Sequence, residues 1–136
     1  MNKKPFVIFG LVLVLLAVAI PAWAYLADGD PHNGRMEVPE NLEAGQSLFI
    51  DNCGNCHKLY AAGTDGNFGP DLDQKLAPAG EATTTEQIDG LKQQVLNTIE
   101  QGADDPSVPG NMPAGIVTGP GAEEVAEFVA ATAGRG

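Results

Sequence analysis

The chain has 136 residues, which is enough for one domain with short appendages. Its formal net charge is -11, and the acidic residues are spread along the chain rather than gathered in a tail. Such a charge would be repelled by phosphate backbones, so the composition argues against a nucleic-acid-binding protein.

The first 27 residues predict an export signal, a membrane anchor, or both. Lys3 and Lys4 form a positively charged start, and the apolar run over residues 6–20 has the length of a signal peptide. Residues 22–24, Ala-Trp-Ala, are similar to a small-x-small cleavage site. The uncharged stretch 5–27 is also long enough to span a bilayer as a helix. Both interpretations deliver the rest of the chain outside the cytoplasm, and the length of the apolar run makes us favour a retained anchor.

Residues 28–40 are polar, rich in glycine and proline, and without periodicity. This composition predicts a flexible tether between the N-terminal segment and a following domain at residues 41–136. His32 and Met36 lie in the tether. Either side chain could ligate a metal, but a lone His or Met in a linker is more often solvated or packed locally, and we favour that interpretation.

Apolar residues at three- and four-residue spacing predict a helix over about residues 40–51, with Asn41 as a plausible N-cap. Gly45 lies on the apolar face of this helix, where glycine costs roughly 1 kcal/mol of helix propensity. We expect the compensation to be the close approach of another helix.

The stretch after this helix, residues 53–57 (Cys-Gly-Asn-Cys-His), matches the attachment motif of a c-type haem. The chemistry requires these residue types at this spacing. Two thiols add to the two vinyl groups of the porphyrin, and the adjacent imidazole is then placed to ligate the iron from the same side. We therefore predict that Cys53 and Cys56 hold one covalent haem c and that His57 is an iron ligand.

Three other interpretations of the cysteine pair fit less well. A thioredoxin-like redox dithiol expects a βαβ context, which the sequence does not indicate. A closed structural zinc site needs four ligands, and the only other histidine, His32, lies in the tether. The third interpretation is a small structural disulfide in an exported protein.

A glycine-rich loop follows the motif over residues 60–72, and we expect its glycines to prevent regular structure. A metal-bound imidazole usually donates its other N–H to an acceptor that fixes its orientation. Because Pro70 is rigid and leaves its carbonyl free, a turn that folds back on His57 could supply this acceptor.

The best-patterned helix is predicted over residues 84–101. Thr84 and Gln87 fit a capping box at its start, and Gly102 is the expected C-cap. We expect this helix to form a wall of the cofactor pocket. A final helix is predicted over residues 121–132, with its apolar residues on one side and its glutamates largely opposite.

Between these helices, prolines interrupt residues 104–121 and predict an extended segment. This segment contains Met112, the only methionine downstream of the haem motif. A thioether on a loop braced by Pro113 is typical of a sixth iron ligand. The alternative is a methionine that fills a gap in the core. We favour ligation and predict that Met112 is the second axial ligand.

Together and in this order, these motifs resemble the class I cytochrome c family. The resemblance covers residues 42–132 and is carried by the haem motif, Gly69-Pro70, Met112-Pro113 and the closing helix. It implies an all-α fold with three main helices around a covalently bound haem in residues 41–136. In this chain a hydrophobic helix would precede that fold.

The resemblance also assigns roles to individual residues. It implies thioether bonds at Cys53 and Cys56, with His57 as the proximal ligand oriented by the Pro70 carbonyl and Met112 as the distal ligand. It further implies that the first and last helices cross, with Gly45 and Phe49 meeting Phe128.

The function implied is one-electron transfer rather than enzymatic catalysis, between a quinol-oxidising complex and a terminal oxidase. The protein would act as a tethered carrier or as a fixed subunit, at the periplasmic side or outer face of the cytoplasmic membrane. If Met112 does not bind the iron, a five-coordinate haem peroxidase or gas sensor is the alternative. Neither nucleic acid nor a small-molecule substrate is expected.

The partners predicted here differ from those of the familiar mitochondrial members, which dock through a ring of lysines. Only Lys58, Lys75 and Lys92 are present in this domain. The acidic surface instead predicts redox protein partners with basic docking patches, and transfer rates that fall as salt rises.

Overall fold

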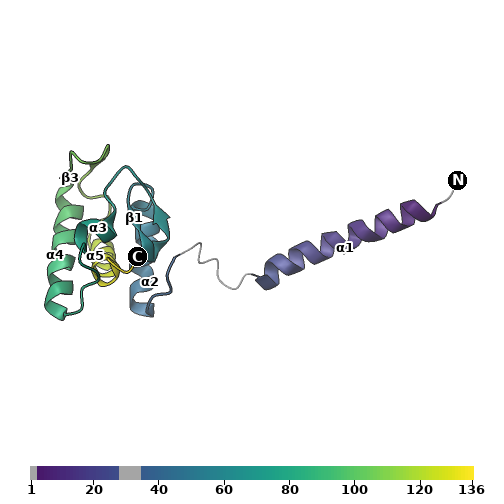
Figure 1. Cartoon of the computed structure of the whole chain (residues 1–136), viewed down its shortest axis with the longest axis horizontal. Helices are drawn as coiled ribbons and strands as arrows, with labels where there is room; N and C mark the ends of the chain where they lie inside the picture. Colours follow the sequence, from purple (N-terminus) through teal and green to yellow (C-terminus); the bar gives the residue numbers. More distant parts are fainter. Residues whose placement is uncertain (1–2, 28–34) are drawn as a thin grey trace. The chain divides into compact units, whose positions relative to one another are not determined.

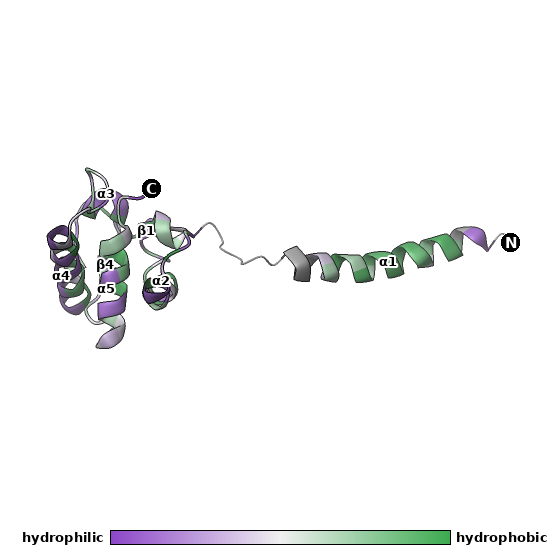
Figure 2. Ribbon diagram, turned by 90° about the horizontal axis from the view of Figure 1, so that it is seen from below, coloured by the Kyte–Doolittle hydropathy of each residue, from purple (hydrophilic) through white to green (hydrophobic). Residues whose placement is uncertain are grey.

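The computed structural model describes residues 3–27 and 35–136, which belong to two separate units. The first unit contains helix α1 (Lys4–Ala27), whose residues Phe6–Trp23 have a mean hydropathy of 2.7. Figure 2 shows the apolar character along most of this helix. By length and composition α1 is able to cross a membrane, and it confirms the predicted N-terminal hydrophobic helix.

The second unit is built on three main helices, α2 (Glu40–Asn52), α4 (Thr85–Gln101) and α5 (Pro120–Thr132). Helix α5 packs against both others and lies between them (Figures 1 and 2). A fourth, short helix, α3 (Leu72–Leu76), follows the glycine-rich loop. The all-α fold with three main helices is therefore confirmed.

The crossing of α2 and α5 depends on Gly45. A methyl group at this position would collide with the carbonyl oxygen of Glu124 and lie 2.8 Å from Cβ of Phe128. One turn further along α2, the ring of Phe49 packs on Phe128, with a centroid distance of 5.9 Å and an interplanar angle of 59°. Both aromatic side chains are almost completely buried. The helix contact predicted from the glycine on the apolar face is confirmed.

The helix ends agree with the sequence patterns in part. The hydroxyl of Thr84 accepts from the N–H of Gln87, whose side chain accepts from the N–H of Thr84, so the capping box is confirmed. Gly102 ends α4 with a φ of 73°. The prediction of Asn41 as the N-cap of α2 is wrong, because the helix already begins at Glu40, after Pro39.

The loops hold more regular structure than their composition indicates. Strand β1 (Lys58–Leu59) pairs antiparallel with β2 (Thr64–Asp65), and a short 3-10 helix, η1 (Tyr60–Ala62), connects them. The expectation that glycine prevents regular structure here is wrong. Gly63 has a φ of 63° and permits the tight turn between η1 and β2.

The C-terminal part of the predicted tether packs on the domain. Val38 is buried, and Met36 contacts the hydrophobic core. The side chain of Gln46 donates to the carbonyls of Met36 and Ala61, each at 2.8 Å. Met36 is therefore packed locally, as favoured above. His32 lies outside the described residues.

Candidate functional site

The residues of the Cys-x-x-Cys-His motif form a compact turn that continues from the C-terminus of α2. The N–H of Cys53 donates to Phe49 O at 2.8 Å, and the N–H groups of Cys56 and His57 both donate to Cys53 O. The Cys53 thiol is buried, whereas Cys56 is exposed. Burial, together with the nearby Cys56 thiol, raises the pKa of Cys53 to about 11, so this thiol is neutral at physiological pH.

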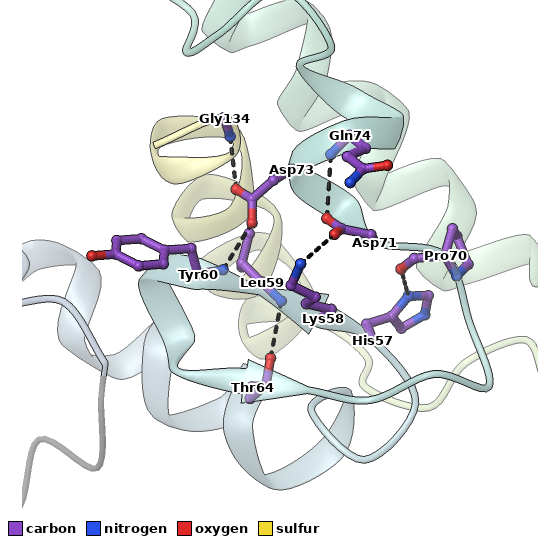
Figure 3. Close-up of polar contacts among 10 residues, drawn as sticks. All are labelled: His57, Lys58, Leu59, Tyr60, Thr64, Pro70, Asp71, Asp73, Gln74 and Gly134. Atoms are coloured by element: carbon purple, nitrogen blue, oxygen red, sulfur yellow. Dashed lines mark hydrogen bonds and ion pairs between the residues drawn. The ribbon is translucent and has the colours of Figure 1, made fainter. Parts of the chain in front are cut away.

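His57 is held by its neighbours in the glycine-rich loop (Figure 3). Its Nδ1 lies 3.1 Å from the carbonyl oxygen of Pro70. Because a carbonyl only accepts, this contact requires the proton on Nδ1 and leaves Nε2 with a free lone pair for a metal. The predicted turn at Pro70 does fold back on His57.

Gly69 sets how closely this loop approaches the imidazole. A methyl group at Gly69 would lie 2.5 Å from Cε1 of His57 and 2.7 Å from Nδ1. The N–H of Gly69 also donates to Cys56 O at 2.8 Å, which fastens the loop to the motif itself. The contact of Gly69 with the imidazole was not predicted, and the glycine directly before Pro70 was the available signal.

Two further contacts fasten the segment after His57 to the segment after Pro70 (Figure 3). Lys58 Nζ and Asp71 Oδ2 form an ion pair at 2.8 Å, alongside a parallel backbone bridge between the same residues. Burial would raise the pKa of Asp71, but hydrogen bonds from Lys58 and from the N–H of Gln74 outweigh it and lower that pKa.

The second of these contacts is made by Asp73, a buried carboxylate that sequence reasoning missed. Its Oδ2 accepts from the N–H of Tyr60 and its Oδ1 from the N–H of Gly134, both at 2.8 Å. Asp73 thus joins α3 to η1 and to the turn after α5. No spacing in the sequence distinguishes it from the other carboxylates of this acidic chain.

Met112 lies in a short hairpin that begins where α4 ends. Strand β3 (Ala103–Asp104) pairs antiparallel with β4 (Asn111–Met112), and Ala103 is the register partner of Met112. Gly102 permits this close return, since a methyl group there would lie 2.6 Å from Met112 O. The segment is non-helical, as expected, although its two short strands were not predicted.

A cavity of about 480 Å³ lies between these elements, and all five predicted site residues line it: Cys53, Cys56, His57, Pro70 and Met112. Most of the remaining wall is apolar and comes from all four helices of the domain, including Phe49, Leu72, Val95, Ile99, Val125 and Val129. The volume is within the range of roughly 300–1,000 Å³ typical of cofactor sites. Two thiols, an imidazole and a thioether in an apolar cavity fit a covalently attached haem.

The other interpretations of the cysteine pair find little support in the structure. Within residues 3–27 and 35–136, no group of three or more His, Cys, Asp or Glu side chains is arranged to hold a metal ion. The strands of this described part are antiparallel pairs of two residues each, which is not a βαβ unit. Both cysteines are free thiols rather than a disulfide.

Comparison with known protein families identifies the domain. The family model for cytochrome c matches residues 42–132. This range begins in α2, ends with α5, and includes every residue predicted for the site. No curated protein matches the chain.

Proposed function

Since the chain belongs to the cytochrome c family, we propose that it is a one-electron carrier whose iron is held between His57 and Met112. Family membership establishes that the protein is a c-type cytochrome, with covalent haem c and its iron as cofactor. It also makes the protein an electron carrier rather than an enzyme. Our proposal is the assignment of individual residues as the haem attachment points and iron ligands.

The observation that carries the residue assignment is the shared cavity. Residues separated by 59 positions, from 53 to 112, line one apolar space and present to it the donor types that the cofactor requires. Cys53 and Cys56 would form the thioether bonds, and the Nε2 lone pair of His57 would bind the iron. The thioether of Met112, a soft and uncharged donor, would complete the coordination.

The side chains around the cavity would tune electron transfer. Haem c supplies the one-electron chemistry, its iron alternating between ferrous and ferric. Met112 favours the ferrous form, because thioether ligation raises the reduction potential. The hydrogen bond from His57 to Pro70 O acts in the opposite direction, since it makes the imidazole a stronger donor. Apolar walls exclude water and disfavour an additional positive charge.

Electrons would enter and leave where the site meets solvent. Cys56 is exposed, and Phe68, which also lines the cavity, is 57% exposed. The three lysines of the domain do not offer a free basic surface, because they pair with Asp71, Asp105 and Glu127. Because the lysine charges are neutralised within the domain, the surface is dominated by its acidic residues, which supports partners with basic docking patches.

The N-terminal helix supports a location at a membrane. Domains of this family are typically extracytoplasmic, and α1 has the length and composition of an export signal or an anchor. We favour the anchor, which would raise the effective concentration of the domain near membrane complexes. The partners proposed from this location are a quinol-oxidising complex as donor and a terminal oxidase as acceptor.

Carbon monoxide binding tests the coordination. Reduced wild-type protein should resist carbon monoxide because Met112 occupies the iron, and Met112→Ala should bind it rapidly. Fast binding by the wild-type protein would overturn the carrier proposal and favour the five-coordinate peroxidase or gas sensor.

An intact mass of the protein purified from its native membrane tests the anchor. A full-length chain plus one haem is the expected result. A mature chain that starts at Tyr25, after the Ala-Trp-Ala sequence, would eliminate the anchor.

A further inference from the structure

A backbone hydrogen bond connects the loop that orients His57 to the loop that carries Met112. The N–H of Gly110 donates to the carbonyl oxygen of Phe68 at 2.8 Å. Phe68 lies just before the Gly69-Pro70 turn, and Gly110 lies two residues before Met112. The two sides of the cavity are therefore fastened to each other at this point.

Only glycine allows the two backbones to approach this closely. A methyl group at Gly110 would collide with the carbonyl oxygen of Phe68 and would lie 3.0 Å from its carbonyl carbon and 3.3 Å from its Cβ. Two of these three atoms are backbone, so they cannot rotate away as the end of a side chain would. Any side chain at position 110 would force the two loops apart.

A second contact, between α3 and the residue that follows β3, is weaker. Lys75 Nζ lies 2.9 Å from Asp105 Oδ2, but the Lys75 side chain is 55% exposed. Exposed ion pairs contribute about 0–1 kcal/mol, and salt weakens them further. The hydrogen bond at Gly110 is short, is independent of charge, and lies nearer to Met112 along the chain.

The other contacts of the Met112 segment lead back to its own hairpin and to α4. Met112 pairs with Ala103, and the N–H of Gly115 donates to Ile99 O at 2.7 Å. These contacts fix the segment relative to α4, which is joined to α2 and the haem motif through α5. The hydrogen bond at Gly110 joins the Met112 loop directly to the loop that holds His57.

We propose that Gly110 is a positioning residue that holds Met112 within reach of the iron, by fastening its loop to Phe68. This inference rests on the proposed function, because it takes Met112 as an iron ligand. When the contact opens, Met112 is released and the sixth position becomes available to an external ligand. Gly110 itself touches neither the iron nor the electron-transfer partner.

The test compares three glycine-to-alanine variants of the haem-loaded full chain. Gly110→Ala should raise the rate of carbon monoxide binding to the reduced protein by about ten-fold or more, as expected for a lost hydrogen bond plus strain. It should also weaken the absorbance band of sulfur-to-iron coordination in the ferric protein. An unchanged rate and band in folded Gly110→Ala would overturn the inference.

Two control variants separate positioning from general destabilisation. Gly45→Ala creates an equally severe clash with backbone, but between α2 and α5. It should lower the stability without speeding carbon monoxide binding. Gly90→Ala, on α4 with nothing within 4 Å, should leave carbon monoxide binding unchanged and raise the stability slightly, because alanine has the higher helix propensity. If Gly45→Ala speeds binding as much as Gly110→Ala, the role of Gly110 is only structural.

A measurement on the wild-type protein keeps the inference testable if Gly110→Ala does not fold. The Gly110 amide should be protected from hydrogen exchange. Excess imidazole, which competes with Met112 for ferric iron, should reduce this protection, because coupling between two contacts is reciprocal. Unchanged protection in imidazole would contradict the inference. Rapid carbon monoxide binding by the wild-type protein would instead contradict the assignment of Met112.

Discussion

Pro70 O lies 3.1 Å from Nδ1 of His57, although thirteen positions separate the two residues in the chain. The contact is made by a backbone atom, so substitution of Pro70 alters its geometry rather than removing it. Proline holds this carbonyl in place because its ring fixes φ. The strength of the His57 hydrogen bond therefore depends on the rigidity of the turn.

Pro70→Ala should raise the reduction potential. A looser turn weakens the hydrogen bond to Pro70 O, which makes the imidazole a poorer donor and disfavours ferric iron. We expect an increase of tens of millivolts, up to about 59 mV, the equivalent of a ten-fold change in a one-electron equilibrium. A potentiometric titration measures this, with Pro78→Ala as the matched control on an exposed loop after α3. A potential that falls, or equal shifts in both variants, would contradict the role of Pro70.

Asp73→Ala should destabilise the domain by about 3 kcal/mol, because it leaves the N–H groups of Tyr60 and Gly134 without their charged acceptor. Asp73→Asn should cost less, since the amide keeps one acceptor oxygen but turns its NH₂ towards a donor. Urea unfolding followed by circular dichroism gives both values. Asp51→Asn, on the exposed side of α2, is the control and should have little effect. Equal stability of all three variants would show that the Asp73 contacts contribute nothing.

Much of this fold is predictable because its signals are local. The haem motif is contiguous, the helices show their apolar spacing, and Thr84 with Gln87 marks a helix start within four residues. Even the α2–α5 crossing has a local signal, since Gly45 interrupts an otherwise apolar helix face. Met112 is identifiable because methionine is rare in this chain.

The residues that were missed make contacts with distant parts of the chain. Gly110 contacts the carbonyl of Phe68, Gly69 lies against the His57 ring, and Asp73 accepts from two N–H groups. A backbone carbonyl or N–H carries no residue identity, and a glycine has no side chain, so no pairing of side-chain types indicates these contacts. The N-cap prediction for Asn41 is wrong for another reason: Pro39, with a φ of -56° and a ψ of 147°, occupies the N-cap position, and no side chain caps the helix.

Asp105→Asn should destabilise the protein at neutral pH, and the difference from the wild type should shrink in acid. Hydrogen bonds from the Ser107 hydroxyl, from Lys75 and from the Ser107 N–H hold the pKa of Asp105 well below its ordinary value of 3.8. A carboxylate with a lowered pKa in the folded state stabilises it fully above the unfolded-state pKa, and this contribution is lost as pH falls towards the folded-state value.

Thermal unfolding of both proteins from pH 7 to pH 2 checks this prediction. The difference between their midpoints should be constant down to about pH 5, and should narrow below about pH 4. A difference between the two midpoints that grows as the pH falls would contradict this prediction. Because the ion pair of Asp105 with Lys75 is exposed, added salt should also reduce the difference at neutral pH.

Electron transfer should depend on the sign of the reagent's charge. With its formal net charge of -11, the protein should react faster at low salt with a cationic oxidant such as tris(phenanthroline)cobalt(III). This rate should fall as ionic strength rises, whereas the rate with ferricyanide should rise. Stopped-flow absorbance of the haem measures both.

If electrons leave at the cavity, removing a charge there should change the rate of the cationic reaction more than removing a charge elsewhere. Asp104 lines the cavity and is exposed, whereas Asp89 lies on α4 and does not line it. Asp104→Asn should therefore slow the cationic reaction more than Asp89→Asn does, and equal effects would place the exit of electrons away from the cavity.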